Sequence, residues 1–467
     1  MNKTTTTVET HRNATAEEEI ALAWASCEVD YNVALSGDYT AKDRKADYFT
    51  AENLNKYLIG KGTVDSVTYK ADGISKLKYT SSTDVNITEQ AFKVDKNGKV
   101  EISTGGSTSK LTAEEKTELA ANNMTELEED DYPEKMQDNS NIKAVITGEG
   151  GDVPIPVNCT YLTGSNKEGS DNYGVVIKDS KNNEWVWIPV PDATVMYNEN
   201  SNGVALSGTT GVKTYKYSKG NILSGVTRST PGTTSYREPD IVTYYDKDEN
   251  ASTYLTQAGF ETKTAAYMAQ TIVDEYENMI ESITQYGGFY VGRYELSGTV
   301  ASPTVQKEKD SLTGVNWYQY YNANKTLGNG IEGVTTGMIW GCEWDIMCNW
   351  IANSGDKKNI NDSTSWGNYK NVTVTDNNNV TIKSSGTGQI LQTGITDYTK
   401  ANNIYDVAGN CYEWTMEAYR TYFRANRGGV YFYNGSGYPA SSRDSFGPGD
   451  TLTDSSSRPT LIINPVP

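Results

Sequence analysis

Two stretches of the chain carry the apolar spacing of an amphipathic helix. Apolar side chains recur at helical intervals through residues 265–286, and Gly287 and Gly288 end the pattern. Residues 338–352 place tryptophan, methionine, cysteine and isoleucine side chains on one side of a second helix. We predict that both apolar faces pack in a core.

The N-terminal part of the chain has a different pattern. A capping threonine, Thr15, precedes a run of glutamates and then a broadly apolar face, which predicts a long helix. A second helical piece is expected at 51–58, and alternating strand patterns cover 64–69 and 92–102. The Asp-Lys-Asn-Gly run at 95–98 is typical of a hairpin turn. The sequence therefore predicts a helix with a small antiparallel sheet.

The residue composition and pattern of the chain change near residue 150. Short strand patterns, loops rich in glycine, asparagine and serine, and clustered tryptophans follow. A chain of 467 residues is longer than a single hydrophobic core usually supports, so two domains are expected. We assign 1–137 to the smaller domain, 138–149, after an acidic run, to a linker, and 150–467 to a larger α+β domain with irregular loops.

The charge balance excludes some partners. The chain has 41 basic and 60 acidic residues, a net charge of −19, which would repel nucleic acid and anionic membranes. No apolar stretch is long enough to span a bilayer, and residues 1–7 lack the apolar core of a signal peptide. We expect an extracellular or cell-surface protein whose export or anchor segment is absent from this chain; a cytosolic protein with a polar N-terminus is the alternative.

The order of elements in residues 14–136 resembles the soluble part of a type IV pilin or pseudopilin. The resemblance is carried by the glutamate-rich opening of the helix and by the sheet that follows it. It implies that the N-terminal domain contacts other pilin-like subunits. An unrelated α+β domain is the alternative.

Seven motifs after residue 150 occur in the order found in one family. They are NEWVWIPV at 183–190, GFYVGRYE at 288–295, VNWY at 315–318, CEWD at 342–345, NIYDVAGNCYEWT at 403–415, RGG at 427–429 and SRPTL at 457–461. Together they resemble the formylglycine-generating-enzyme (sulfatase-modifying factor) domain. The resemblance implies an elaborated C-type-lectin fold.

The motif at 403–415 also suggests a metal. Gly409 allows a backbone turn, around which Asn410 and Glu413 supply side-chain oxygens. In the family this loop resembles a calcium site, so the resemblance implies calcium as the cofactor, with Asn410 and Glu413 as ligands. The alternative is that both side chains only form hydrogen bonds within the loop.

The chemistry of the family's oxidases is not expected here. Those enzymes use a cysteine pair shortly after the Arg-Gly-Gly motif, and residues 429–438 contain no cysteine. The only histidine is His11, so a histidine-held iron centre, as in another branch of the family, is also not expected. No catalytic residue is assigned.

The segment 428–467 has the composition of a binding loop. It contains no Lys, Glu, Gln, Met or Trp, whereas Tyr, Ser, Gly, Asn and Asp are frequent, as in antibody paratopes. The same residue set resembles variable proteins of diversity-generating retroelements, which implies hypervariability. The candidate ligand-binding residues are Tyr431, Tyr433, Asn434, Ser436, Tyr438, Ser441, Ser442, Asp444 and Phe446. An ordinary loop with inward-packed aromatics is the alternative.

These observations predict a non-enzymatic ligand-binding protein or adhesin on a cell surface or pilus-like appendage. Its partner is an unidentified protein or glycan, and neither nucleic acid nor a membrane is expected. Two alternatives stay open. One is a structural pilin-like subunit with a decorating head, and the other is a formylglycine-generating-type oxidase with an atypical active site.

Overall fold

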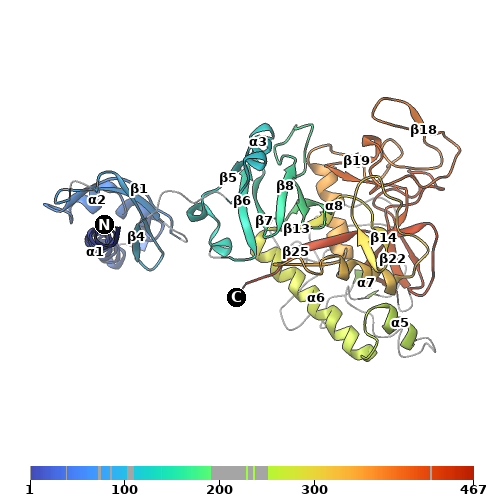
Figure 1. The fold of residues 1–467 in the computed structure, drawn as a ribbon, viewed down its shortest axis with the longest axis horizontal. Coiled ribbons are helices and arrows are strands. Elements are labelled where there is room, and N and C mark those ends of the chain that lie inside the picture. Colours follow the sequence, from blue (N-terminus) through green and yellow to red (C-terminus); the bar gives the residue numbers. More distant parts are fainter. Residues whose placement is uncertain are drawn as a thin grey trace. The chain divides into compact units, whose positions relative to one another are not determined.

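The computed structural model divides the chain into two compact units (Figure 1). It describes residues 2–37, 39–71, 75–84, 87–102, 110–137, 139–190, 228–229, 235–236, 251–420 and 423–466. Unit 1 comprises Met1–Ser109 with Leu127–Gln137, and unit 2 comprises Lys110–Glu126 with Asp138–Pro467. No helix in these described ranges is long and apolar enough to cross a bilayer.

Unit 1 is the predicted helix with a small antiparallel sheet. Its helical elements are α1 (Asn2–Gly37), η1 (Tyr39–Tyr48), α2 (Ala51–Asn55), η2 (Glu129–Asp131) and η3 (Glu134–Met136). The sheet has the order β1-β2-β3-β4, formed by β1 (Gly62–Thr68), β2 (Ser75–Ser81), β3 (Gln90–Val94) and β4 (Val100–Ile102). The inner face of α1, with Ile20, Trp24 and Cys27, shares one core with Leu77 and Phe92 of the sheet.

Two local predictions for unit 1 can be compared with the structure. The turn at 95–98 joins β3 to β4 as expected, with Asp95 Oδ1 accepting from the N–H groups of Asn97 and Lys99. The helix, however, begins at Asn2 rather than at Thr15. Thr15 therefore lies inside α1 and does not cap it.

Unit 2 is built around a six-stranded sheet with the order β16-β25-β13-β10-β9-β8. Its strands are β8 (Cys159–Thr163), β9 (Val176–Asp179), β10 (Glu184–Pro189), β13 (Gly288–Gly292), β16 (Val334–Met338) and β25 (Pro459–Ile463). The central strands β10, β13 and β25 come from the predicted motifs at 183–190, 288–295 and 457–461. Strand β13 is buried along its whole length, so these motifs form the core of the unit.

The helical elements of unit 2 are α3 (Ala113–Ala121), α5 (Ala251–Gln257), α6 (Ala265–Tyr286), α7 (Trp317–Leu327), α8 (Gly341–Asn353) and η5 (Asp397–Thr399). Of these, α3, α6 and α7 contact strands of the six-stranded sheet. Helix α6 has the predicted bounds, with a Thr264 N-cap and Gly287 in the left-handed region at φ +77°. It lies against β13 and β25 (Figure 1), where Ser282 Oγ donates to the Ile463 carbonyl at 2.7 Å.

A second, four-stranded sheet with the order β23-β22-β21-β24 carries the C-terminal motifs. Its strands are β21 (Tyr412–Arg420), β22 (Phe423–Arg427), β23 (Arg443–Phe446) and β24 (Ser455–Ser457). The remaining pairs are β11 (Arg228–Ser229) with β12 (Ser235–Tyr236), β14 (Ser297–Thr299) with β15 (Ser302–Thr304), β17 (Val374–Thr375) with β18 (Thr381–Lys383), and β19 (Lys400–Ala401) with β20 (Ile404–Tyr405).

The predicted boundary between the domains differs from the structure. Residues 138–149, expected to be a linker, contain β6 (Ile142–Gly148), the middle strand of a sheet with β5 (Thr125–Glu126) and β7 (Gly151–Pro156). Buried Ala144, Val145 and Ile146 hold β6 in unit 2, and Lys110–Glu126 also belongs to this unit. The α+β fold class is confirmed, as is the smaller helix-plus-antiparallel-sheet unit before it.

Candidate functional site

The candidate ligand-binding residues lie on the connection between β22 and β23 and on β23 itself. In the order β23-β22-β21-β24, β23 is the edge strand, paired with β22 through Arg427 opposite Arg443 and Arg424 opposite Phe446. The connecting residues 428–442 therefore leave the sheet at one end and return at its edge.

Four aromatic rings are gathered on this connection. Tyr433 and Tyr438 stack with ring centroids 4.1 Å apart and an interplanar angle of 13°. Phe432 contacts both Tyr431 and Tyr433, at centroid distances of 5.1 and 4.6 Å. Tyr433 is 39% exposed and the other three rings are half-buried.

We call a set of eight exposed and half-buried residues of this region the tyrosine surface. It consists of Tyr431, Phe432, Tyr433, Asn434, Ser436, Tyr438, Asp444 and Phe446. Seven of the nine predicted residues belong to it. Phe432 was not predicted, although it stands between two tyrosines that were.

Ser441 and Ser442 do not belong to this surface, which corrects the prediction that they are exposed. Ser441 is fully buried and its hydroxyl donates to Asn361 Oδ1 at 3.1 Å. The carbonyl of Ser442 accepts from Arg427 Nε at 3.0 Å, and Ser442 is 8% exposed. Both residues turn inward because Arg427 holds their backbone under the loop.

The loop backbone has little freedom. Gly429 has φ +74°, and a Cβ at this position would lie 2.0 Å from the Tyr438 carbonyl oxygen, so only glycine permits this close approach. Asn434 Oδ1 accepts from Ser436 Oγ and from the Gly437 N–H, which closes a turn between the stacked tyrosines. The exposed rings are therefore presented on a fixed backbone.

A buried cluster of charges underlies the loop. Arg427 Nη2 lies 2.7 Å from Asp345 of α8, and Arg427 Nη1 lies 3.4 Å from Glu417. Arg443 Nε lies 2.9 Å from Glu417, and Arg443 Nη2 lies 3.6 Å from Asp345. Burial lowers the pKa of Arg443 to about 9. Two carboxylates and two guanidinium groups thus form a neutral cluster that fixes both ends of the loop.

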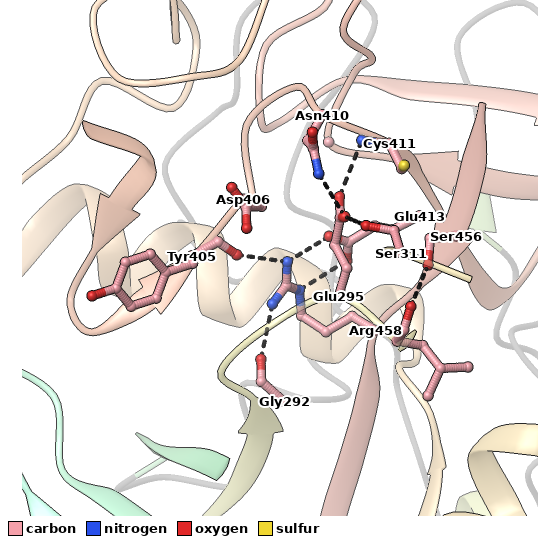
Figure 2. A network of polar contacts seen from close by, with 12 residues as sticks. Gly292, Glu295, Ser311, Tyr405, Asp406, Asn410, Cys411, Glu413, Ser456 and Arg458 are labelled. Atoms are coloured by element: carbon pink, nitrogen blue, oxygen red, sulfur yellow. Dashed lines mark hydrogen bonds and ion pairs between the residues drawn. The ribbon is translucent and has the colours of Figure 1, made fainter. Parts of the chain in front are cut away.

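The structure places Asn410 and Glu413 in a separate buried network (Figure 2). Glu413 faces Arg458, whose Nε and Nη2 lie 2.9 and 2.5 Å from the two carboxylate oxygens. Asn410 Oδ1 accepts from Asn368 and from the Leu391 N–H. These side-chain oxygens face protein donors, a guanidinium among them, so the pair does not fit a cation site. We therefore expect EDTA to leave ligand capture by the chain unchanged. Loss of capture in EDTA would favour the calcium prediction instead.

The same network contains the carboxyl group of Glu295, for which the sequence predicts no role. Glu295 is fully buried, its Oε1 accepts from the Cys411 N–H, and its Oε2 lies 2.5 Å from Ser311 Oγ and 2.7 Å from Asn410 Nδ2 (Figure 2). Burial raises the pKa of Glu295 well above its usual value, and the carboxylates of Asp406 and Glu413 raise it further.

The network holds more acidic groups than its one guanidinium can neutralise. Burial raises the pKa of Asp406, and it raises the pKa of Glu413 to about 7 although Arg458 opposes the shift. Ser311 Oγ and Asn410 Nδ2 both donate to Glu295 Oε2, which opposes the upward shift of its pKa only in part. These groups are at most 2% exposed, and Arg458 links Glu413 of β21 to the Gly292 carbonyl of β13.

The five cysteines are free thiols and all are buried. Cys342 and Cys348 therefore do not pair with each other, nor with Cys159 or Cys411. Burial raises the pKa of Cys27 to about 11 and the pKa values of Cys159 and Cys348 to about 12, so these thiols are protonated near neutral pH.

We therefore expect Ellman's reagent to leave the native chain unlabelled and to label all five thiols after denaturation. Absorbance at the released thionitrobenzoate band measures the reaction. Rapid labelling of one thiol in the folded chain would contradict this expectation and favour the oxidase alternative.

Comparison with known proteins adds little to this geometry. No family model matches the chain, and no curated protein matches it. A crystal structure of CarF is similar over 38% of this chain and 87% of that chain, at 13% identity and a TM-score of 0.27. Treponema denticola variable protein 1 is similar over 67% of this chain and 97% of that chain, at 12% identity and a TM-score of 0.16. At these TM-scores neither likeness carries a functional argument.

Proposed function

We propose that this chain is a non-enzymatic ligand-binding protein whose tyrosine surface captures an extracellular protein or glycan. The observation that carries the proposal is the exposed stack of Tyr433 on Tyr438, held on a loop of fixed backbone. Large rings with few rotatable bonds supply contact area at a low cost in side-chain entropy. A preorganised loop loses little further freedom on binding.

The surroundings of the loop support this proposal over the oxidase alternative. A thiol oxidase needs an accessible thiolate, whereas the described thiols are buried and three have pKa values near 11 or 12. The carboxyl groups with raised pKa values, Glu295, Asp406 and Glu413, are at most 2% exposed and do not belong to the tyrosine surface. The tyrosine surface itself carries phenols, an amide, a hydroxyl and a carboxylate, which suit recognition.

A screen of the purified chain on protein and glycan arrays tests the proposal. We expect saturable binding to a restricted set of ligands, without turnover of those ligands. Absence of any saturable binding, or conversion of a bound ligand into a product, would contradict the proposal.

One observation favours a role in assembly for unit 1. Leu22, Val29 and Val33 are 63%, 59% and 66% exposed on α1, and their spacing of seven and four residues places them on one helix face. The opposite face of the helix packs in the unit 1 core. A pilin-like subunit would bury such a stripe against a neighbouring subunit, which supports a structural subunit as the second candidate function.

We expect Leu22→Ser/Val29→Ser/Val33→Ser to abolish any self-association of the chain without lowering its stability, because the three side chains are already exposed in the monomer. Sedimentation velocity over a range of concentrations measures association. The matched control is Ile59→Ser, which removes a side chain that is 85% exposed outside the stripe. A chain that is monomeric at every concentration, or equal association of both variants, would argue against the assembly role.

A further inference from the structure

The charges that the C-terminal segment exposes are all negative. Segment 428–467 contains two arginines and three aspartates. The Arg443 side chain is 3% exposed and the Arg458 side chain is fully buried. By contrast, Asp450 is exposed, and Asp444 and Asp454 are half-buried. Burial of both guanidinium groups in ion clusters therefore leaves carboxylates as the exposed ions of this segment.

One of these aspartates, Asp444, lies beside aromatic rings. Asp444 Oδ2 accepts from the Tyr412 hydroxyl at 3.2 Å, and the Tyr412 ring contacts Phe446 at a centroid distance of 6.1 Å. Burial raises the pKa of Tyr438, and the neighbouring phenol of Tyr433 and the carboxylate of Asp444 raise it further.

Burial also raises the pKa of Tyr431, and the carboxylate of Asp454 raises it further. The carboxylates of Asp444 and Asp454 thus both act on phenols of the tyrosine surface. Their negative potential at the phenols favours a positive charge brought to the ring faces.

We propose that the tyrosine surface binds a cationic group, in the form of lysine or arginine side chains of a basic polypeptide segment. The inference rests on the proposed function and specifies the chemistry of the ligand. Ring faces attract cations through their quadrupole, and carboxylates beside the rings add a Coulomb term of the same sign. An acidic or phosphate-bearing ligand would meet repulsion on this surface.

One exposed cation lies next to the surface. The backbone N–H of Lys370 donates to the Tyr433 carbonyl, and Lys370 is exposed. A positive charge on a residue attached at this point makes the potential near the surface less negative. Removal of this charge is therefore expected to strengthen the binding of a basic peptide.

The test uses three synthetic peptides of one length that carry lysine, norleucine or glutamate at the same positions. Isothermal titration with the full chain is expected to rank their affinities as lysine, then norleucine, then glutamate. Asp444→Asn and Tyr433→Leu should each weaken lysine-peptide binding about fivefold, and Lys370→Gln should strengthen it. Tyr433→Phe keeps the ring and should bind as the parent chain does.

Asp171→Asn is the matched control, because Asp171 is exposed elsewhere in unit 2 and its loss changes the net charge of the chain equally. If Asp171→Asn and Asp444→Asn weaken lysine-peptide binding equally, the peptide is attracted only by the net charge of the chain, and the inference is overturned. An array ligand that needs the tyrosines but is acidic, and is unaffected by Asp444→Asn, would also overturn it while the proposed function stands. Absence of any array ligand would instead remove the proposed function.

Discussion

Arg458→Met is expected to lower the free energy of unfolding of unit 2 by about 3–5 kcal/mol, because it leaves a buried carboxylate without its counter-ion. Arg458 makes two contacts to Glu413 and donates to the carbonyl oxygens of Gly292 and Tyr405. Removal of the guanidinium therefore leaves four acceptor contacts unmade. Urea denaturation followed by tryptophan fluorescence measures the loss.

Two further variants distinguish the effect of the unpaired Glu413 carboxylate from the effect of lost packing around Arg458. Glu413→Gln in the Arg458→Met background removes the unpaired charge and should restore part of the stability. Lys167→Met removes a lysine whose ion pair with Glu149 is exposed, and it should change stability by less than about 0.5 kcal/mol. If Arg458→Met and Lys167→Met have equal effects, the network in Figure 2 does not hold unit 2 together.

Tyr431→Ala/Tyr433→Ala/Tyr438→Ala is expected to abolish ligand capture. Binding energy at protein interfaces is concentrated in a few aromatic anchors, and loss of one such anchor costs about 2 kcal/mol or more, roughly thirtyfold in affinity. Tyr433 and Tyr438 stack on each other, so loss of either ring also disturbs the other. We expect the triple variant to lose more affinity than any of the single variants. Titration of the chosen array ligand measures the change.

The matched control for this variant is Tyr57→Ala/Tyr267→Ala, which removes two exposed tyrosines outside the surface. It should bind as the parent chain does. The triple variant should keep the cooperative unfolding of the parent chain, because its rings are exposed or half-buried. Loss of binding together with loss of folding would make the result uninformative about recognition, so both are measured on one preparation.

Elements with strong local patterns could be predicted from the sequence. Helix α6 has a regular apolar period, a capping Thr264 and a terminal Gly287, so its bounds are set by adjacent residues. The start of α1 could not be predicted, because residues 2–13 are polar and carry no apolar period. The composition changes near residue 150, which favours a domain boundary there, whereas strand β6 lies before that point and has the apolar content of a buried strand at 142–148.

The candidate site shows the same division between local and long-range information. The aromatic residues at 431–438 are close in sequence, so their gathering on one loop was predictable. The burial of Ser441 and Ser442 depends on Arg427, and the partner of Glu413 is Arg458, 45 residues away. No periodicity connects such pairs, although Arg458 and Glu295 both lie in motifs that were identified.

The central claim is that the tyrosine surface recognises a ligand. The most direct test is a protein and glycan array screened in parallel with the parent chain and with Tyr431→Ala/Tyr433→Ala/Tyr438→Ala. We expect the parent chain to capture a restricted set of ligands and the folded triple variant to capture none of them. Equal capture of the same ligands by both chains would contradict the account.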